Sequence, residues 1–146
     1  MKKIGILLLT SFVIIAVTGC CSKDEVLRVT APDKSTEAVL IETNCGANVS
    51  FGYKVYVTPR GASTWRGKEV ANLYGAVRNN GAYGVNLRWL SADSLSIEYL
   101  KAQDERLEKP TVNVSGRDIL ISLKSGIEDQ TAPEGGMLWN LQKRKT

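Results

Sequence analysis

The chain has 146 residues, with 19 lysines and arginines against 15 aspartates and glutamates and a formal net charge of +4. It contains no histidine, which excludes a Ser-His-Asp triad, a Cys-His pair, the HExxH metalloprotease motif and histidine-based zinc sites. From this composition we expect no metal site and no cofactor.

The N-terminal segment has the pattern of an export signal. Lys2 and Lys3 precede an apolar stretch of 14 residues from Ile4 to Val17. As a helix this stretch would rise about 21 Å, which is shorter than the hydrocarbon core of about 30 Å. We therefore expect a cleaved signal helix rather than a membrane-spanning one.

The apolar stretch ends in Val17, Thr18, Gly19 and Cys20, that is, an aliphatic residue, a small residue, glycine and cysteine. These residues resemble the lipobox of bacterial lipoproteins. The resemblance implies cleavage before Cys20, a diacylglycerol in thioether linkage to its sulfur, and an acyl chain such as palmitate on its amino group. Stable anchoring needs two chains, at about 0.8 kcal/mol per buried methylene. The alternative is an uncleaved apolar anchor in which the cysteine occurs by chance.

The same resemblance implies a location and a division of the chain. The protein is expected on the extracytoplasmic side of the cell envelope, and residue 21 is not the aspartate that retains such proteins at the inner membrane of enteric-type bacteria. This implies the outer membrane where the organism has one. We expect a signal peptide at 1–19, a lipidated cysteine and tether at 20–25, a β domain at 26–142 and a basic tail at 143–146.

The charge balance gives no reason to expect a nucleic-acid partner. Loss of residues 1–19 removes two lysines and leaves 17 basic against 15 acidic residues. The remaining local excess is Lys143 to Lys145. Such a triplet at a chain end is typical of a solvated tail, and weak attraction to anionic lipid head groups is the alternative.

Beyond the tether, the chain is expected to form short strands separated by turn signals. The expected strands are 26–29, 38–43, 51–58, 69–77, 84–90, 95–99, 111–114, 118–123 and 137–141. Apolar and polar residues alternate most clearly in 51–58 and 84–90. Asn80 and Gly81 predict a type I′ turn, which requires positive φ at both positions. Residues 101–109 have a helical composition but few apolar residues, and a surface turn or loop explains them equally well.

This pattern predicts one all-β domain, an antiparallel meander, sandwich or open barrel, behind the N-terminal signal helix. The expected core consists of apolar residues on the alternating faces of these strands. They are Val39, Ile41, Val55, Val57, Val85, Leu87, Trp89, Leu95, Ile97, Ile119 and Ile121.

Two cysteines remain after lipidation, Cys21 and Cys45. Export leads to an oxidising space in many bacteria, where the two could form a disulfide. Such a bond would stabilise the fold by roughly 3 kcal/mol in the chain-entropy model. The alternatives are a buried, inert Cys45 or a reactive thiol, whose pKa only lysine or arginine could lower here.

The loop after residue 43 is a candidate binding loop, with Asn44, Gly46 and Asn48 as its possible contacts. Small residues let a ligand approach the backbone, and binding residues are often found in loops. The alternative is a structural connection in which the glycine supplies an unusual backbone angle.

A second candidate surface is aromatic. Four aromatic residues near loops and three arginines could bind a protein or stack on a glycan, or could simply pack at the rim of the core. These residues are Trp65, Trp139, Tyr74 and Tyr83, with Arg66, Arg78 and Arg88.

The acidic pairs at 104–105 and 128–129 indicate no ion site, because neighbouring residues on a strand point to opposite faces. Calcium loops also need a ligand spacing that is absent here.

The mature chain resembles, more loosely, small bacterial envelope lipoproteins of unassigned function. The segments that carry this resemblance are 44–47 leading into 51–59, then 87–90, and 135–141. Such a family implies no catalytic residues. We expect a lipid-anchored envelope protein without enzymatic activity that binds an envelope protein or polymer. The alternatives are an envelope hydrolase using carboxylates or a lysine-activated serine, an immunity-type inhibitor of an envelope toxin, and a structural spacer.

Overall fold

A computed structural model describes residues 20–132. The signal helix, the strand expected at 137–141, Trp139 and the basic tail lie outside the described residues. Within 20–132, no helix is long and apolar enough to span a membrane. The prediction of an all-β fold is confirmed: the described residues form strands, loops and one short 3₁₀ helix.

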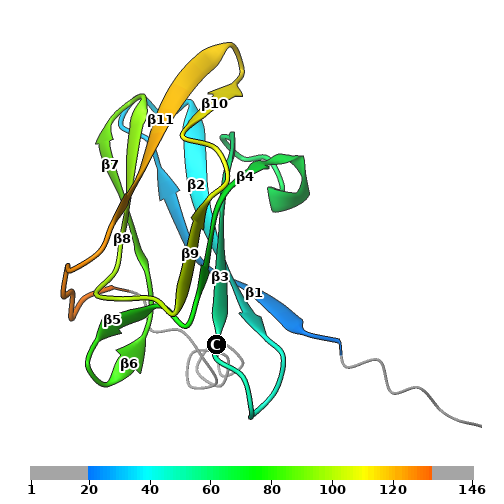
Figure 1. Cartoon of the computed structure of the whole chain (residues 1–146). Helices are drawn as coiled ribbons and strands as arrows, with labels where there is room; N and C mark the ends of the chain where they lie inside the picture. The colour runs from blue at the N-terminus through cyan, green and yellow to red at the C-terminus, as the bar shows by residue number, and fades with distance from the viewer. Residues whose placement is uncertain (1–19, 133–146) are drawn as a thin grey trace, which may run out of the picture.

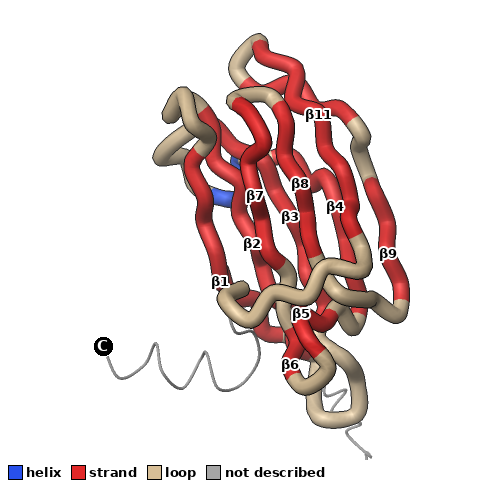
Figure 2. Tube along the Cα trace, turned by 90° about the vertical axis from the view of Figure 1, so that its left-hand side faces the viewer, coloured by secondary structure: helices blue, strands red, loops and turns tan. Residues whose placement is uncertain are grey.

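Two sheets face each other as the layers of a sandwich (Figures 1 and 2). The first has the order β1-β2-β3-β4-β9 and is antiparallel throughout. Its strands are β1 (Ser22–Thr30), β2 (Thr36–Asn44), β3 (Gly52–Pro59), β4 (Lys68–Tyr74) and β9 (Asp104–Leu107).

The second sheet has the order β10-β11-β8-β7. Its strands are β7 (Asn86–Ser91), β8 (Ser94–Glu98), β10 (Thr111–Val114) and β11 (Arg117–Lys124). A small hairpin of β5 (Val77–Asn79) and β6 (Ala82–Tyr83) lies at the lower end in Figure 1. The Trp89 Nε1–H donates a 3.0 Å hydrogen bond to the Val29 carbonyl, which joins the edge strands β7 and β1 of the two sheets.

The core lies between the two sheets, because alternate residues of each strand point inward. Its larger buried members are Leu40, Tyr53, Val55, Val57, Val70, Leu73, Val85, Leu87, Leu95, Ile97, Tyr99, Val112, Val114, Ile119 and Ile121. Most of the predicted core residues are among them, and Trp89 packs against the cluster while half-buried.

The predicted inward face of β2 is wrong. Ala38 and Leu40 belong to the core cluster, whereas Val39 is buried outside it and Ile41 is only half-buried. The pattern of apolar and polar residues gave the wrong face because Glu42 points inward. Its carboxylate is buried and accepts a 2.8 Å hydrogen bond from the Tyr53 hydroxyl. A buried carboxylate needs such a donor, and sequence patterning treats its position as outward.

One strand pair departs from the antiparallel prediction. β11 runs parallel to β8, with Ile121 opposite Leu95 and Leu123 opposite Ile97. The cause is the segment after β8, which crosses to the first sheet and forms β9 before the chain returns as the β10–β11 hairpin. Residues 104–107, for which the sequence left a helix and a surface turn or loop equally open, are therefore an edge strand.

The predicted hairpins at 84–99 and 111–123 are confirmed as β7–β8 and β10–β11. The type I′ prediction is wrong at Asn80 and Gly81, neither of which has positive φ. The Asn79 side chain instead accepts a hydrogen bond from the Gly81 N–H at 2.9 Å. Paired positive φ values occur at Ser115 (53°) and Gly116 (82°), in the β10–β11 turn.

The tether is shorter than expected. β1 begins at Ser22, which pairs with Asn44, so the residues expected to be a free spacer are part of the sheet. The reason is that β2 continues to Asn44 and offers backbone partners to that point. Cys21 and Cys45 form a disulfide directly beyond the last pair. Cys20 therefore stands two residues from the first sheet.

Candidate binding site

Trp65 is the most exposed large apolar side chain of the described residues, with 83% of its surface accessible. It lies in the loop between β3 and β4, within the 3₁₀ helix η1 (Thr64–Arg66). The Arg66 guanidinium lies 5.7 Å from the centre of the Trp65 ring, a cation–π distance. An exposed tryptophan has no role in the core, and such residues often mark contact surfaces.

A hollow of about 240 Å³ lies beside the indole ring. Its walls come from β1, β2, β3 and the loop, and they consist of Lys23, Ile41, Tyr56, Thr64 and Trp65. Ile41 was expected in the core, but because the opposite face of β2 points inward, its side chain lies on the outer face of the sheet and lines this hollow.

The Tyr56 side chain in this hollow is positioned by a hydrogen bond to Glu69. Its hydroxyl donates to Glu69 at 2.8 Å, and the Lys54 ammonium also contacts Glu69 at 2.9 Å. Burial, followed by the contact with Glu69, raises the pKa of Tyr56 to about 12. The phenol therefore remains a neutral hydrogen-bond donor at physiological pH.

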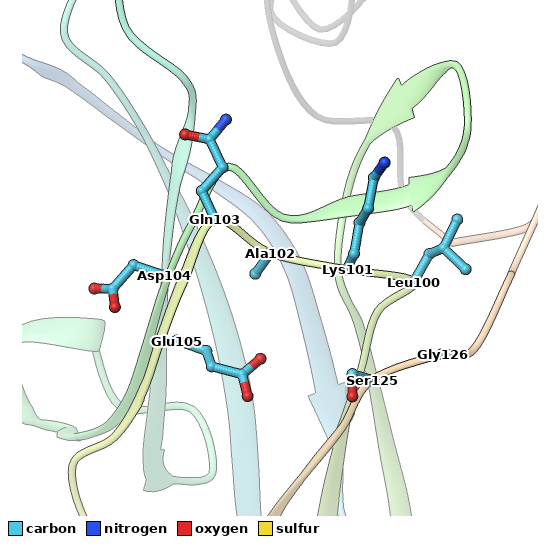
Figure 3. Close-up of a pocket in the computed structure, with 8 residues that line it drawn as sticks. All are labelled: Leu100, Lys101, Ala102, Gln103, Asp104, Glu105, Ser125 and Gly126. Carbon is cyan, nitrogen blue, oxygen red and sulfur yellow. The ribbon is translucent and has the colours of Figure 1, made fainter.

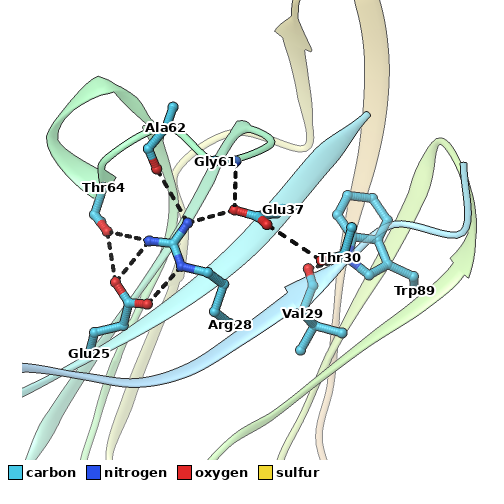
Figure 4. Close-up of polar contacts among 9 residues, drawn as sticks. All are labelled: Glu25, Arg28, Val29, Thr30, Glu37, Gly61, Ala62, Thr64 and Trp89. Carbon is cyan, nitrogen blue, oxygen red and sulfur yellow. Dashed lines mark hydrogen bonds and ion pairs between the residues drawn. The ribbon is translucent and has the colours of Figure 1, made fainter. Parts of the chain in front are cut away.

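An ionic network fixes the loop that carries Trp65 (Figure 4). At its centre, the Arg28 guanidinium donates to both oxygens of Glu25, at 2.7 and 2.8 Å, and to Glu37 at 2.7 Å. It also reaches the loop itself, at the Ala62 carbonyl (3.3 Å) and the Thr64 hydroxyl (3.1 Å). One arginine thus links β1, β2 and the loop, as its planar fork of donors allows.

Glu37 completes the network from β2. Its carboxylate accepts the Gly61 N–H at 3.2 Å, and Gly61 has φ of 72°, a conformation that favours glycine. Only 10% of the Glu37 side chain is exposed. Burial alone would raise its pKa, but the hydrogen bonds from Arg28 and Gly61 outweigh burial and hold the pKa of Glu37 below its ordinary value. The pKa of Arg28 is raised, chiefly by its hydrogen bond to Glu25.

Acid is expected to destabilise the protein through Glu37. Because its pKa is lower in the folded chain, the unfolded chain binds a proton more readily as the pH falls. The stabilisation is therefore complete above the ordinary glutamate pKa of 4.5 and is lost progressively below it. Denaturant unfolding followed by circular dichroism between pH 7 and 3 measures this loss. A Glu37→Gln variant should show a shallower decline, and equal slopes in the two proteins would contradict this assignment.

The predicted binding loop is only partly assembled into a site. Asn44 and Gly46 line a second hollow, of about 450 Å³, whose walls also include Ala47, Val49, Phe51 and Tyr83, and Asn48 is not among them. Asn44 Oδ1 accepts a 2.9 Å hydrogen bond from the Gly46 N–H, and Gly46 has φ of 117°. These two residues therefore shape the loop, as in the structural alternative.

The described members of the candidate aromatic surface do not form a single patch, as in the alternative of rim packing. Trp65 and Arg66 are together, but the hydroxyls of Tyr74 and Tyr83 contact Ser50, in the loop before β3. Arg78 is buried, and its guanidinium donates to the carbonyls of Gln130 and Ala132. Arg88 pairs with Glu98 on the second sheet.

Sequence reasoning missed the Arg28 network entirely. The loop groups that Arg28 contacts lie 34 and 36 positions away, and no short-range pattern reports such a contact. The indication that the sequence did offer is a tryptophan in an otherwise polar loop.

A third hollow, of about 630 Å³, lies at residues 100–105 and 125–126 (Figure 3). Glu105 extends toward Ser125, whereas Asp104 points the opposite way. The Tyr99 hydroxyl donates to Glu105. Burial, followed by this contact, raises the pKa of Tyr99. A glycosidase needs two carboxylates facing across one space, and this pair on β9 does not provide that arrangement.

The other acidic pair has a structural role at Asp129, whose carboxylate accepts the N–H groups of Thr131 and Ala132. Within residues 20–132, no group of three or more cysteine, aspartate or glutamate side chains could hold a metal ion.

Comparisons of this chain with protein-family models, with curated proteins and with solved structures give no match.

Proposed function

We propose that this protein is a lipid-anchored binding module of the bacterial cell envelope and that Trp65 is the centre of its contact surface. The observation that carries the binding function is an indole that is 83% exposed on a loop that the Arg28 guanidinium contacts at Ala62 and Thr64. A loop ordered before binding loses little entropy when a partner docks, so more of the contact energy appears as affinity.

The anchor is supported by the lipobox-like residues that end at Cys20 and by the short connection to the sheet. A Cys21–Cys45 disulfide suits a protein exported to an oxidising compartment. Together these features favour a domain held close to a membrane surface, outside the cytoplasm.

A protein is the partner that this surface fits best. Tryptophan, tyrosine and arginine are the residues that dominate protein–protein contacts, and Trp65, Tyr56 and Arg66 are grouped here. The hollow beside the indole is small, and Ile41, Tyr56 and Trp65 give it a mainly apolar lining, which suits one apolar side chain of a partner better than a polymer strand.

The test is photo-crosslinking in intact cells. A photoreactive amino acid replaces Ser63, which is exposed in the same loop, and is combined with native Trp65 or with Trp65→Ala. We expect one discrete protein adduct, reduced at least tenfold by Trp65→Ala, because loss of a tryptophan at the centre of an interface costs about 2 kcal/mol or more.

The matched control carries the photoreactive group at Leu120, which is 56% exposed on the second sheet, and should give no such adduct. A ladder that collapses after digestion of the cell-wall polymer would identify a polymer instead of a protein. Adducts that are absent at residue 63, or that do not change on Trp65→Ala, would contradict the binding surface.

A further inference from the structure

The second hollow lies at the end of the sandwich where the described chain begins. Its apolar walls include Val49, which is 44% exposed, and the rings of Phe51 and Tyr83. These rings meet edge to face with their centres 5.0 Å apart. Tyr83 belongs to the β5–β6 hairpin, so the hollow is lined by this hairpin and by the loop at residues 44–51. The hairpin and the loop lie at the same end of the sandwich in Figure 1.

Hydrogen bonds hold the loop against its neighbours. The Ser50 N–H donates to the Tyr74 hydroxyl at 2.9 Å, and the Gln103 side chain donates to the Ser50 hydroxyl at 2.7 Å. The Gly75 N–H donates to the Phe51 carbonyl at 2.8 Å. The hollow is therefore formed by connected parts of the fold and does not depend on the loop alone.

This loop is tied covalently to the segment that begins at Cys20. Cys45 lies within the loop and is joined to Cys21, the residue directly after Cys20. Two residues of extended chain span about 7 Å, and β1 begins at Ser22. The acyl groups expected on Cys20 therefore cannot be far from the loop.

The two segments that form the hollow carry no charge, although Lys101, in the connection from β8 to β9, and Asp104, at the start of β9, lie beside them. Residues 44–52 and 79–84 contain no charged side chain. The charged residue nearest to Cys45 in sequence is Glu42, which is buried against Tyr53. Lys23 and Asp24, the nearest to Cys21, lie on β1 rather than in the loop. At the opposite end of the sandwich, the turns carry charged residues: Asp33, Lys34, Arg60, Asp93 and Arg117.

We propose that the end formed by residues 44–51 and 79–84 contacts the membrane that holds Cys20, and that an acyl chain of a membrane phospholipid occupies the hollow at Val49. This inference rests on the proposed lipidation of Cys20. Uncharged segments with an exposed valine and aromatic rings suit the boundary between head groups and hydrocarbon, where such residues lower the free energy of contact.

The experiment places a photoreactive amino acid at Val49 in the full-length protein, in cells whose phospholipids carry radioactive phosphate. Phosphate reports phospholipid alone, because the thioether-linked diacylglycerol on Cys20 contains none. Leu90 is the matched control: it is 50% exposed and lies near the charged β7–β8 turn at the other end. Ala47, exposed on the wall of the hollow, serves as a second test position.

We expect phospholipid adducts at positions 49 and 47 in at least tenfold excess over position 90. Mass spectrometry of Cys20 from the same cells separates the two hypotheses. Acylated Cys20 without an excess of adducts at 49 and 47 would overturn the membrane contact alone. Unacylated Cys20 would overturn both the anchor and the contact.

Discussion

Replacement of Arg28 by alanine is expected to lower the free energy of unfolding by about 3 kcal/mol. The change leaves Glu37, which is 10% exposed, without its guanidinium partner, and removal of one member of a buried ion pair is strongly destabilising. It also removes the hydrogen bonds to Ala62 and Thr64 that fix the loop carrying Trp65. Equilibrium denaturation measures the loss in stability.

Lys54→Ala is the matched control for Arg28→Ala. Lys54 pairs with Glu69, but both side chains are more exposed, at 33% and 28%, and such pairs contribute about 1 kcal/mol or less. A double variant, Arg28→Met with Glu37→Leu, removes both charges and should regain part of the lost stability. If Arg28→Ala costs no more than Lys54→Ala, the network does not support the loop as described.

Loss of the disulfide should have an effect of similar size. The bond joins residues separated by 24 positions, and closing a loop of this length restricts the unfolded chain by roughly 3 kcal/mol. We expect Cys45→Ser to lower the free energy of unfolding by about that amount, and reductant to have the same effect on the parent protein. Denaturation with and without reductant provides the measurement.

Both proteins for this comparison carry Cys20→Ser, so that the exposed Cys20 thiol cannot form a mixed pairing. The Cys45→Ser variant should then lose its response to reductant. A parent protein in which both remaining cysteines alkylate rapidly while folded, and whose stability reductant does not change, would contradict the disulfide.

The strands of the fold could be predicted because local patterning reports them. Alternating residues such as Tyr53, Val55 and Val57 reveal an inward face, and the turns at 92–93 and 115–116 close hairpins between such strands. These signals act over a few residues, which is the range that a single sequence shows clearly.

The face of β2 could not be predicted, because β2 is buried on both sides. Val39 is fully buried on the outer face, and Glu42 is buried with Tyr53 on the inner face. Alternation of polar and apolar residues identifies a core face only where the opposite face meets water.

The parallel pairing of β8 with β11 depends on contacts that are distant in sequence. The 99–110 segment pairs with β4 before the chain returns to the second sheet, and its composition resembles a helix more than a strand. Tertiary pairing decided its conformation, as it often does for edge strands. The candidate site could not be predicted for the same reason: Arg28 joins residues from three segments that are distant in sequence.

The most direct test of the account is the chemical state of Cys20. Intact-mass and peptide analysis of the protein from its own cells, combined with labelling by a clickable fatty acid, should show a chain that begins at Cys20 with a diacylglycerol on its sulfur and an acyl group on its amino group. Cys20→Ser should abolish the label and leave the precursor uncleaved. An unlabelled protein in the cytosol that retains residues 1–19 would contradict the account.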